Sequence, residues 1–299
     1  MNGRRSRCSS YSDFWEKKMT RILVLGANGK TGRCVAEALS TRENALVRCA
    51  SRIPTSASQA AFDWVSRQTW RPALEGIEAL YLMKPASTET NPDVRDQVAD
   101  LLDCAPALRR VVLLSEIDAG TRTEDLDERR VERLIENSSL EWTILRPHWF
   151  MQNFVDPSFY LSQLRSEGRV SVPTGGHATS FVDTRDVGDV AAAALLDGVH
   201  AGKHYTLTGP ASHTWAEAIS MISFVSGRQL SYEDAPLEAF LAERSSPHAM
   251  VKFADHNRAV YEFLGSSTSS AISEDVERVI GRPARTFETF VREAAPLWR

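Results

Sequence analysis

The sequence of 299 residues has few of the features that mark secreted, membrane or nucleic-acid-binding proteins. Its formal net charge is -4, so no overall basic field favours nucleic acid or an anionic membrane surface. No apolar run approaches the roughly 20 residues that a membrane-spanning helix needs. The cysteines form no CxxC pair, which argues against a disulfide framework or a zinc site and suits a reducing cytoplasm. They are Cys8, Cys34, Cys49 and Cys104.

The seven histidines show no metal-ligand spacing, so we expect no metal site. A hydrophobic content of 42% and a charged content of 25% are those of an ordinary globular protein. Residues 1–18 are partly basic but have no apolar core, so we expect a loose tail rather than a secretory signal. We expect a core domain in residues 19–155. Residues 156–299 should form mainly a cap, interleaved with the core sheet. The oligomeric state does not follow from the sequence.

A short apolar run that ends in closely spaced glycines organises the first part of the chain. Residues 22–25 predict a buried strand, and residues 31–39 predict an amphipathic helix. The turn between them contains Gly26, Asn28, Gly29, Lys30, Thr31 and Gly32. Bare backbone amides at a helix N-terminus favour a bound phosphate, because the amides and the helix dipole both point at it. A tight turn without a ligand is the alternative, and the surrounding sequence must decide.

The second expected strand, residues 45–52, ends in Ser51 and Arg52, 20 residues beyond the last glycine of the turn. In dinucleotide-binding βαβ units this position meets the adenosine ribose, and an acidic residue there accepts from the 2′-hydroxyl of NAD. A guanidinium instead pairs with a 2′-phosphate, so we expect NADP(H). A solvent-exposed arginine is the alternative. Asp63, in a third short strand at 61–64, could approach the adenine amino group or form a turn.

Further apolar runs alternate with helical segments and predict an α/β fold with a Rossmann-like, doubly wound parallel sheet. Strands are expected at 79–83, 111–115 and 142–145, and helices at 91–102, with Pro92 as first helical residue, and 124–136. The second half predicts a small α/β cap, with a strand at 203–208 and helices at 183–196 and 215–225, the latter capped by Thr214 and Glu217. Ligands bind such sheets at the carboxyl ends of the strands. Lys84, Ser115 and Pro147 all lie there.

Together these segments resemble the NmrA-like group of atypical short-chain dehydrogenases, from about residue 20 to the end of the chain. Within that group the chain is most similar to reductases of the festuclavine synthase/agroclavine dehydrogenase type. Besides the glycine turn and Ser51-Arg52, the motifs that carry the resemblance are Phe62-Asp63-Trp64 and residues 110–115, 142–154, 181–187 and 205–210. The resemblance implies an NADP-binding core in residues 19–155 and a substrate-binding cap mainly in residues 156–299. The pyrophosphate would lie over Gly29 to Gly32, with the 2′-phosphate on Arg52. Lys84, Pro85 and Ser115 would line the ribose–nicotinamide end, with the wall beside the ring at Pro147 to Phe150.

Most dehydrogenases of this superfamily carry a Tyr-x-x-x-Lys pair that moves a proton to or from a substrate oxygen. The corresponding segment, residues 125–136, contains neither a tyrosine nor a lysine. We interpret its charged part, 124–132, as a solvated helix face. Ketone–alcohol chemistry is therefore disfavoured. A hydride acceptor that needs little acid from the protein fits better: an imine or iminium, a quinone or an enone.

Ser115 and His148 are the candidate catalytic residues, and Glu116 and Asp118 are further proton carriers. A structural role is the favoured alternative for His148 and for the two carboxylates. Trp149, Phe150 and Phe154 could form an apolar pocket for a flat substrate, or they could be core.

The sequence therefore predicts an NADPH-dependent reductase of a small, apolar, cyclic or aromatic metabolite, of the kind found in specialised metabolism. The alternatives are a non-catalytic NADP(H)-sensing regulator and a redox-neutral cyclase or isomerase on the same fold.

Overall fold

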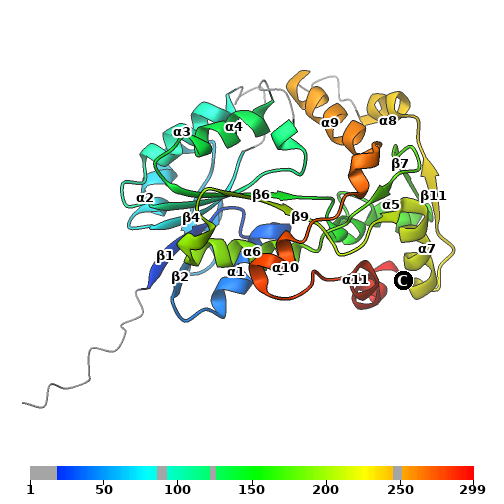
Figure 1. Ribbon diagram of the computed structural model, residues 1–299, viewed down its shortest axis with the longest axis horizontal. Helices are drawn as coiled ribbons and strands as arrows, with labels where there is room; N and C mark the ends of the chain where they lie inside the picture. The colour runs from blue at the N-terminus through cyan, green and yellow to red at the C-terminus, as the bar shows by residue number, and fades with distance from the viewer. Residues whose placement is uncertain (1–18, 86–92, 122–125, 245–250) are drawn as a thin grey trace, which may run out of the picture.

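Seven parallel strands form the central sheet of the computed structural model, which describes residues 19–85, 93–121, 126–244 and 251–299 (Figure 1). Their order is β3 (Gln59–Ala61), β2 (Ala45–Ser51), β1 (Thr20–Val24), β4 (Ala79–Met83), β5 (Arg110–Leu114), β6 (Glu141–Pro147) and β9 (Lys203–Leu207). The chain winds outward from β1 in one direction and from β4 in the other, so the direction of winding switches between these two strands. This is the doubly wound α/β fold that the sequence predicts, and ligands of such sheets bind at the switch.

Helices cover both faces of the sheet because its strands carry apolar side chains on both sides. One face, with Leu23 and Leu80, packs against α2 (Trp70–Leu74), α3 (Val94–Asp103) and α4 (Asp127–Glu136). The other, with Ile22 and Tyr81, packs against α1 (Lys30–Ser40), α6 (Thr184–Leu196) and α10 (Asp275–Ile280). The two layers lie above and below the sheet in Figure 1.

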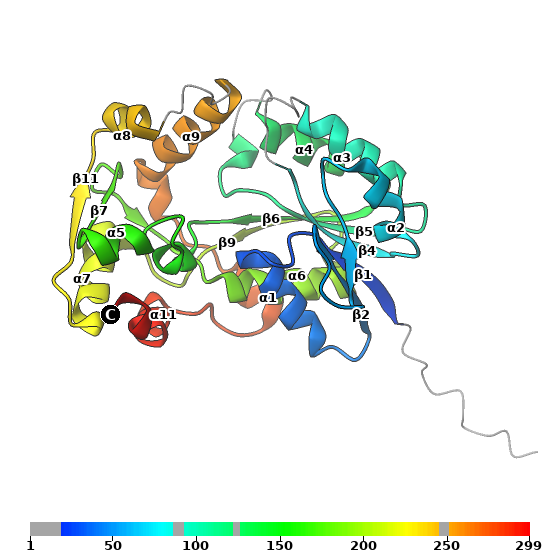
Figure 2. The same ribbon diagram turned by 180° about the vertical axis from the view of Figure 1, so that it is seen from behind.

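Much of the second half of the chain forms a cap beyond one end of the sheet, seen from behind in Figure 2. Its core is an aromatic cluster around the fully buried Trp215. Its helices are α5 (Leu161–Ser166), α7 (Trp215–Ser226), α8 (Leu237–Arg244), α9 (Val251–Leu264) and α11 (Phe287–Ala294). Its short strands are β7 (Arg169–Val172), β8 (Ala178–Thr179), β10 (His213–Thr214) and β11 (Ser231–Asp234). Within the described segments, no helix is long and apolar enough to cross a membrane.

Most of the expected elements are confirmed, with shifts at their ends. Thr214 and Glu217 form the expected capping box of α7. The strand expected at 61–64 lies earlier, as β3, so Asp63 follows the strand instead of belonging to it. The helix expected from residue 91 begins at Val94, where the Asp93 carboxylate accepts from the Asp96 amide and caps it. Pro92 lies outside the described residues.

Helices α1 and α6 approach each other closely beneath the sheet because α6 is built from small residues. A Cβ atom placed on Gly188 of α6 would lie 2.6 Å from the carbonyl carbon of Cys34 in α1. Ala191 and Ala192 of α6 are fully buried. This close contact sets the position of α1, whose N-terminus carries the glycine turn.

We predict that Gly188→Ala lowers the free energy of unfolding by roughly 1–3 kcal/mol, the usual cost of overpacking a core. Helix propensity alone would raise the free energy of unfolding, because alanine is the better helix former by about 1 kcal/mol. Denaturant unfolding followed by circular dichroism measures the change. Ala193→Ser, at a half-buried position of the same helix, is the control. A Gly188→Ala variant as stable as the wild type would contradict the close contact.

Candidate functional site

The glycine turn between β1 and α1 is shaped as a cradle. Gly26 has a φ of 65°, a left-handed conformation that suits glycine, and its carbonyl accepts from the Gly29 amide at 2.8 Å. A Cβ atom on Gly32 would lie 2.2 Å from the Gly26 oxygen, so the third glycine lets the helix meet the turn. Among the described residues, no side chain caps the start of α1. These amides therefore fit a phosphate, as the sequence predicts.

Ser51 ends β2 and Arg52 follows it, at the same edge of the sheet as the glycine turn. The side-chain Nδ2 of Asn28 in the glycine turn donates to the Ser51 hydroxyl at 3.4 Å, which links the turn to the end of β2. Arg52 is exposed beside this link. The Asp63 carboxylate accepts from the Val65 amide at 3.0 Å, as a turn-forming aspartate does. Its approach to the adenine amino group stays a prediction.

A cavity of about 350 Å³ lies where β4, β5 and β6 end. Residues that follow these strands make one side, and α9 of the cap contributes to the other. The lining residues are Lys30, Met83, Lys84, Leu114, Ser115, Glu116, Ile117, Asp118, Pro147, His148, Trp149, Phe150, Asn153, Phe159, His256, Val260 and Phe263. Most of the predicted cofactor and pocket residues after β4, β5 and β6 therefore come together, with Lys30 of the glycine turn at the same wall. Pro85 is buried next to Lys84 in the chain.

Lys30 spans the glycine turn and the cavity wall. Its ammonium donates to the Asn153 Oδ1 at 2.9 Å and to the Asp156 Oδ2 at 2.7 Å, and it lies 3.7 Å from the centre of the Phe159 ring. Burial lowers the pKa of Lys30, and the contacts with Asp156 only partly oppose that shift. The Lys30 side chain thus links the glycine turn to the segment that follows β6.

Helix α4 does not present a solvated face at its charged part, contrary to the sequence interpretation. Glu128, Arg129 and Glu132 are buried, and the Glu132 side chain is fully so. The signal was present in the sequence. Glu128 and Glu132 are spaced as i and i+4 and share a helical stripe with Val131 and Ile135, which pack into the core.

The Glu132 carboxylate lies beneath the cavity and accepts four hydrogen bonds. Its Oε1 accepts from the Ser115 hydroxyl at 2.7 Å and from the Arg146 Nε at 2.9 Å. Its Oε2 accepts from Arg146 at 2.7 Å and from Arg129 at 2.8 Å. Burial alone would raise the pKa of Glu132, but the hydrogen bonds from Arg146 and Ser115 outweigh it and the pKa is lowered. The carboxylate is therefore ionised and paired.

Because of this pairing, Ser115 does not have the expected catalytic role of a proton donor. Its proton is committed to the ionised Glu132, so Ser115 cannot serve as an acid toward a bound molecule. Its oxygen lone pairs remain able to accept a hydrogen bond, as from a ribose hydroxyl or an amide.

The expectation that His148 carries a proton is also wrong. Its Nδ1 accepts from the Trp149 amide at 2.6 Å, and its Nε2 donates to the Ser269 carbonyl at 2.8 Å. Burial lowers the pKa of His148 to about 4, although the bond to Ser269 acts in the opposite direction. The ring is neutral with both nitrogens engaged, so it holds the end of β6 against the cap.

The aromatic residues divide between cavity and core. Trp149 and Phe150 line the cavity, as expected. Phe154 does not, because it is fully buried in the cap, with its ring centre 5.3 Å from that of Trp215 and 5.5 Å from that of Phe287. The expectation that Phe154 contacts substrate is therefore wrong.

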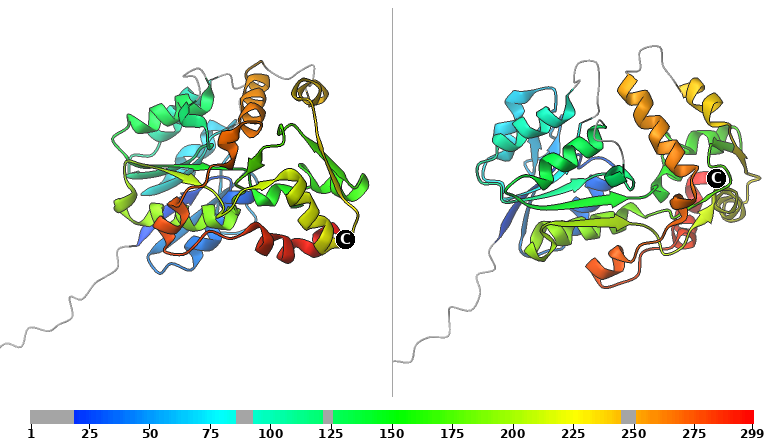
Figure 3. Two further views of the ribbon diagram at one scale, coloured as in Figure 1. Left: turned by 45° about the vertical axis from the view of Figure 1, so that its right-hand side comes forward. Right: turned by 45° about the horizontal axis from the view of Figure 1, so that its top comes forward.

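Helix α9, which the sequence does not predict as part of the site, brings His256, Val260 and Phe263 to the cavity. No motif in the sequence marks these residues. Figure 3 shows α9 standing over the same side of the sheet as α4. His256 Nδ1 lies 3.3 Å from the Glu128 Oε1, to which Lys84 Nζ also pairs at 2.7 Å.

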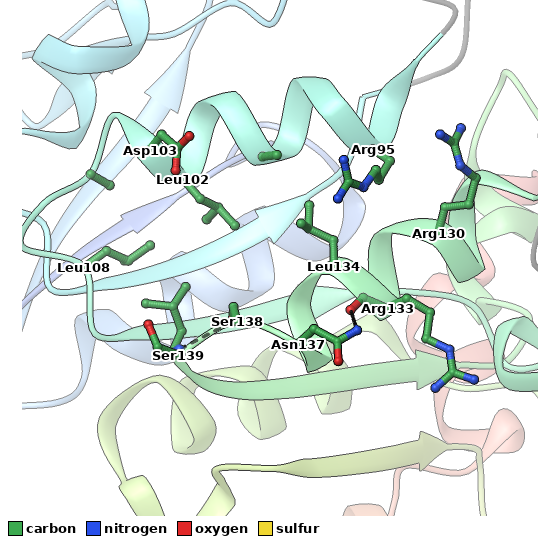
Figure 4. Close-up of a pocket in the computed structure, with 13 residues that line it drawn as sticks. Arg95, Leu102, Asp103, Leu108, Arg130, Arg133, Leu134, Asn137, Ser138 and Ser139 are labelled. Atoms are coloured by element: carbon green, nitrogen blue, oxygen red, sulfur yellow. Dashed lines mark hydrogen bonds between the residues drawn. The ribbon is translucent and has the colours of Figure 1, made fainter.

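A larger hollow of about 560 Å³ lies between α3 and α4, away from the glycine turn (Figure 4). Arg95, Arg130 and Arg133 line part of it, but each pairs with a carboxylate: Asp96, Asp93 and Glu136, respectively. None of the described residues that line it belongs to the glycine turn or follows the end of β5 or β6. The cavity at the ends of β4, β5 and β6 is therefore the candidate functional site.

Comparison with known proteins agrees with this geometry. Residues 26–198 match a family model described as NAD(P)H-binding, and residues 127–289 match the NmrA-like family. The chain is 32% identical to the (4-alkanoyl-5-oxo-2,5-dihydrofuran-3-yl)methyl phosphate reductase of Streptomyces griseus, over 92% of this chain and 98% of that protein. It is 26% identical to festuclavine synthase I of Penicillium roqueforti, over 93% and 99%.

The fold is similar to that of the NADPH-dependent quinone oxidoreductase of Escherichia coli, solved in complex with NADPH. The TM-score is 0.73 at 20% identity, and the match covers 91% of this chain and 99% of that one. The glycine cradle, the strand-end cavity and both family matches lead to one conclusion. The chain belongs to the NmrA-like family and is an NAD(P)H-dependent reductase.

Proposed function

We propose that the protein is an NADPH-dependent reductase of a small, largely apolar, cyclic or aromatic metabolite. The observation that carries this proposal is the cavity at the ends of β4, β5 and β6, which adjoins the glycine turn and has Trp149 and Phe150 in its wall. A flat molecule fits between aromatic walls of this kind. A cavity in this place supports turnover over a purely nucleotide-sensing role.

Different residues of the chain bind different parts of the cofactor and the acceptor. The amides at the start of α1 hold the pyrophosphate, and Arg52 pairs with the 2′-phosphate. The Ser115 hydroxyl, which donates its hydrogen bond to the ionised Glu132, accepts from the ribose–nicotinamide end. Trp149 and Phe150 exclude water from the reacting face. A bound reduced nicotinamide supplies hydride.

The acceptor is an imine or iminium, a quinone or an enone, since α4 carries neither the tyrosine nor the lysine that serves ketone chemistry in this superfamily. Relatives support this range. The name of the Streptomyces reductase describes an unsaturated lactone whose double bond is polarised by carbonyl groups. The Escherichia coli structure is that of a quinone oxidoreductase.

We predict that Arg52→Ala weakens NADPH binding about 10- to 100-fold, as expected for loss of a charge-assisted hydrogen bond worth roughly 1.5–3 kcal/mol. NADH binding should stay unchanged because NADH has no 2′-phosphate. Calorimetric titration of both nucleotides measures the effect.

Arg42→Ala, at an exposed position before β2 and hence at the opposite edge of the sheet, is the matched control for the Arg52 variant. Equal wild-type affinity for NADPH and NADH, unchanged in Arg52→Ala, would refute the 2′-phosphate assignment.

We further predict NADPH oxidation with at least one member of a panel of cyclic imines, quinones and enones, followed at the nicotinamide absorbance. Trp149→Ala should raise KM for an accepted substrate more than it lowers kcat, because the ring contributes binding surface. Tight NADPH binding without oxidation by any acceptor would favour a sensor instead.

A further inference from the structure

Four charged or titratable side chains meet at the cavity where α9 faces α4. His256 of α9 lies with its Nδ1 3.3 Å from the Glu128 Oε1 and its Nε2 3.7 Å from the Glu116 Oε1. Lys84, which follows β4, places its ammonium 2.7 Å from the same Glu128 oxygen. Lys84, Glu116 and His256 line the cavity. Glu128 does not line it but pairs with both Lys84 and His256.

The charges of this cluster balance when His256 is protonated. Glu116 and Glu128 then carry two negative charges, and Lys84 and His256 carry two positive ones. Burial opposes the charge on His256, but the bond to Glu128 and the nearby Glu116 outweigh it and the pKa of His256 is raised, with Lys84 acting in the opposite direction. Burial likewise opposes the charge on Glu128, yet His256 and Lys84 hold the pKa of that carboxyl far below its usual range.

The oxygen and nitrogen atoms of Glu116, Glu128 and His256 lie within 4.8 Å of one another, close enough to surround an ion. However, the Lys84 ammonium already pairs with Glu128, and its charge disfavours a second cation. The arrangement instead matches an imidazolium oriented by carboxylates, which is how proteins position a proton donor.

We propose that His256 is the proton donor of this reductase, held at Nδ1 by Glu128 and delivering its proton from Nε2 into the cavity. The inference rests on the proposed function and deepens it. It places the acid on the cap, in α9, whereas the superfamily's usual tyrosine–lysine pair would belong to α4.

Hydride from the reduced cofactor adds two electrons and one hydrogen to the electrophilic atom of the acceptor, and the proton of His256 adds to the atom that receives the displaced electron pair. Neutral His256 then regains a proton from water by way of Glu116, whose side chain is 33% exposed. The net reaction consumes one reduced cofactor and one proton for each acceptor reduced.

This role separates two classes of substrate. An enone needs a proton on its carbon or oxygen after hydride addition, whereas a preformed iminium becomes neutral without one. The cluster therefore favours enones and related carbonyl-activated double bonds as the substrate class.

The first test measures the proton on His256 without turnover. In protein labelled with carbon-13 histidine, an NMR titration of the cofactor-free chain should give His256 a pKa above its ordinary value of about 6.5. His148 is the internal control and should stay neutral from pH 5.5 upward, given its pKa of about 4. A His256 pKa below the ordinary value would overturn the proposal.

The second test compares cyclohexenone with an N-methyl dihydroisoquinolinium ion. His256→Gln should lower kcat/KM for the enone roughly 100-fold, within the usual range for a general acid, and shift the enone-to-iminium rate ratio at least tenfold. In the wild type, enone reduction should fall tenfold per pH unit above the His256 pKa, because the donor is then neutral. His177→Gln, which does not line the cavity, is the control.

Different results would refute the proton-donor role of His256 and the reductase function. If His256→Gln slows both acceptors equally, His256 is structural and the proton-donor proposal is wrong, while the reductase assignment stands. If the wild type reduces neither acceptor nor any other panel member, the proposed function fails. A His256 pKa above 6.5 would then still support the charge state of the cluster.

Discussion

The ionised Glu132 is the constraint on which the site depends. A buried carboxylate destabilises a fold by several kcal/mol unless it is paired and hydrogen-bonded. Here Arg146 of β6, Arg129 of α4 and the Ser115 hydroxyl supply those bonds. The charge therefore joins the ends of β5 and β6 to one helix. The same bond fixes the direction of the Ser115 proton, so a residue that looks catalytic in sequence becomes a hydrogen-bond acceptor.

One turn earlier on the same helical stripe, Glu128 performs a different task. Glu132 is neutralised below the cavity by arginines, whose charge is permanent at any working pH. Glu128 pairs with Lys84 and with His256, a side chain that can gain or lose a proton near neutrality. Of these two glutamates, four residues apart, Glu132 has a structural role through its arginine partners, whereas Glu128 pairs with a histidine that can titrate. This difference gives the site an acid although α4 carries neither tyrosine nor lysine.

The sequence predicted the sheet and the nucleotide turn because both depend on local patterns. Apolar runs mark buried parallel strands, and Gly26 and Gly32 are required by backbone conformation and close approach. The substrate side was predicted less well, since it depends on which distant segments meet. Phe154 and Trp149 belong to one aromatic motif, yet only Trp149 reaches the cavity. His256 lies more than a hundred residues from any strand end it faces, and no spacing rule could have placed it there.

We propose that the glycine turn and the strand-end cavity form one continuous site for cofactor and acceptor. A crystal structure of the full chain with NADP⁺ and a bound enone tests it most directly. We expect the pyrophosphate on the amides of Gly29 to Gly32 and the nicotinamide between Ser115 and Pro147. Its C4 should face the cavity, with the acceptor between it and His256. A nicotinamide whose C4 is covered by protein, or an acceptor bound in the hollow between α3 and α4, would contradict the account.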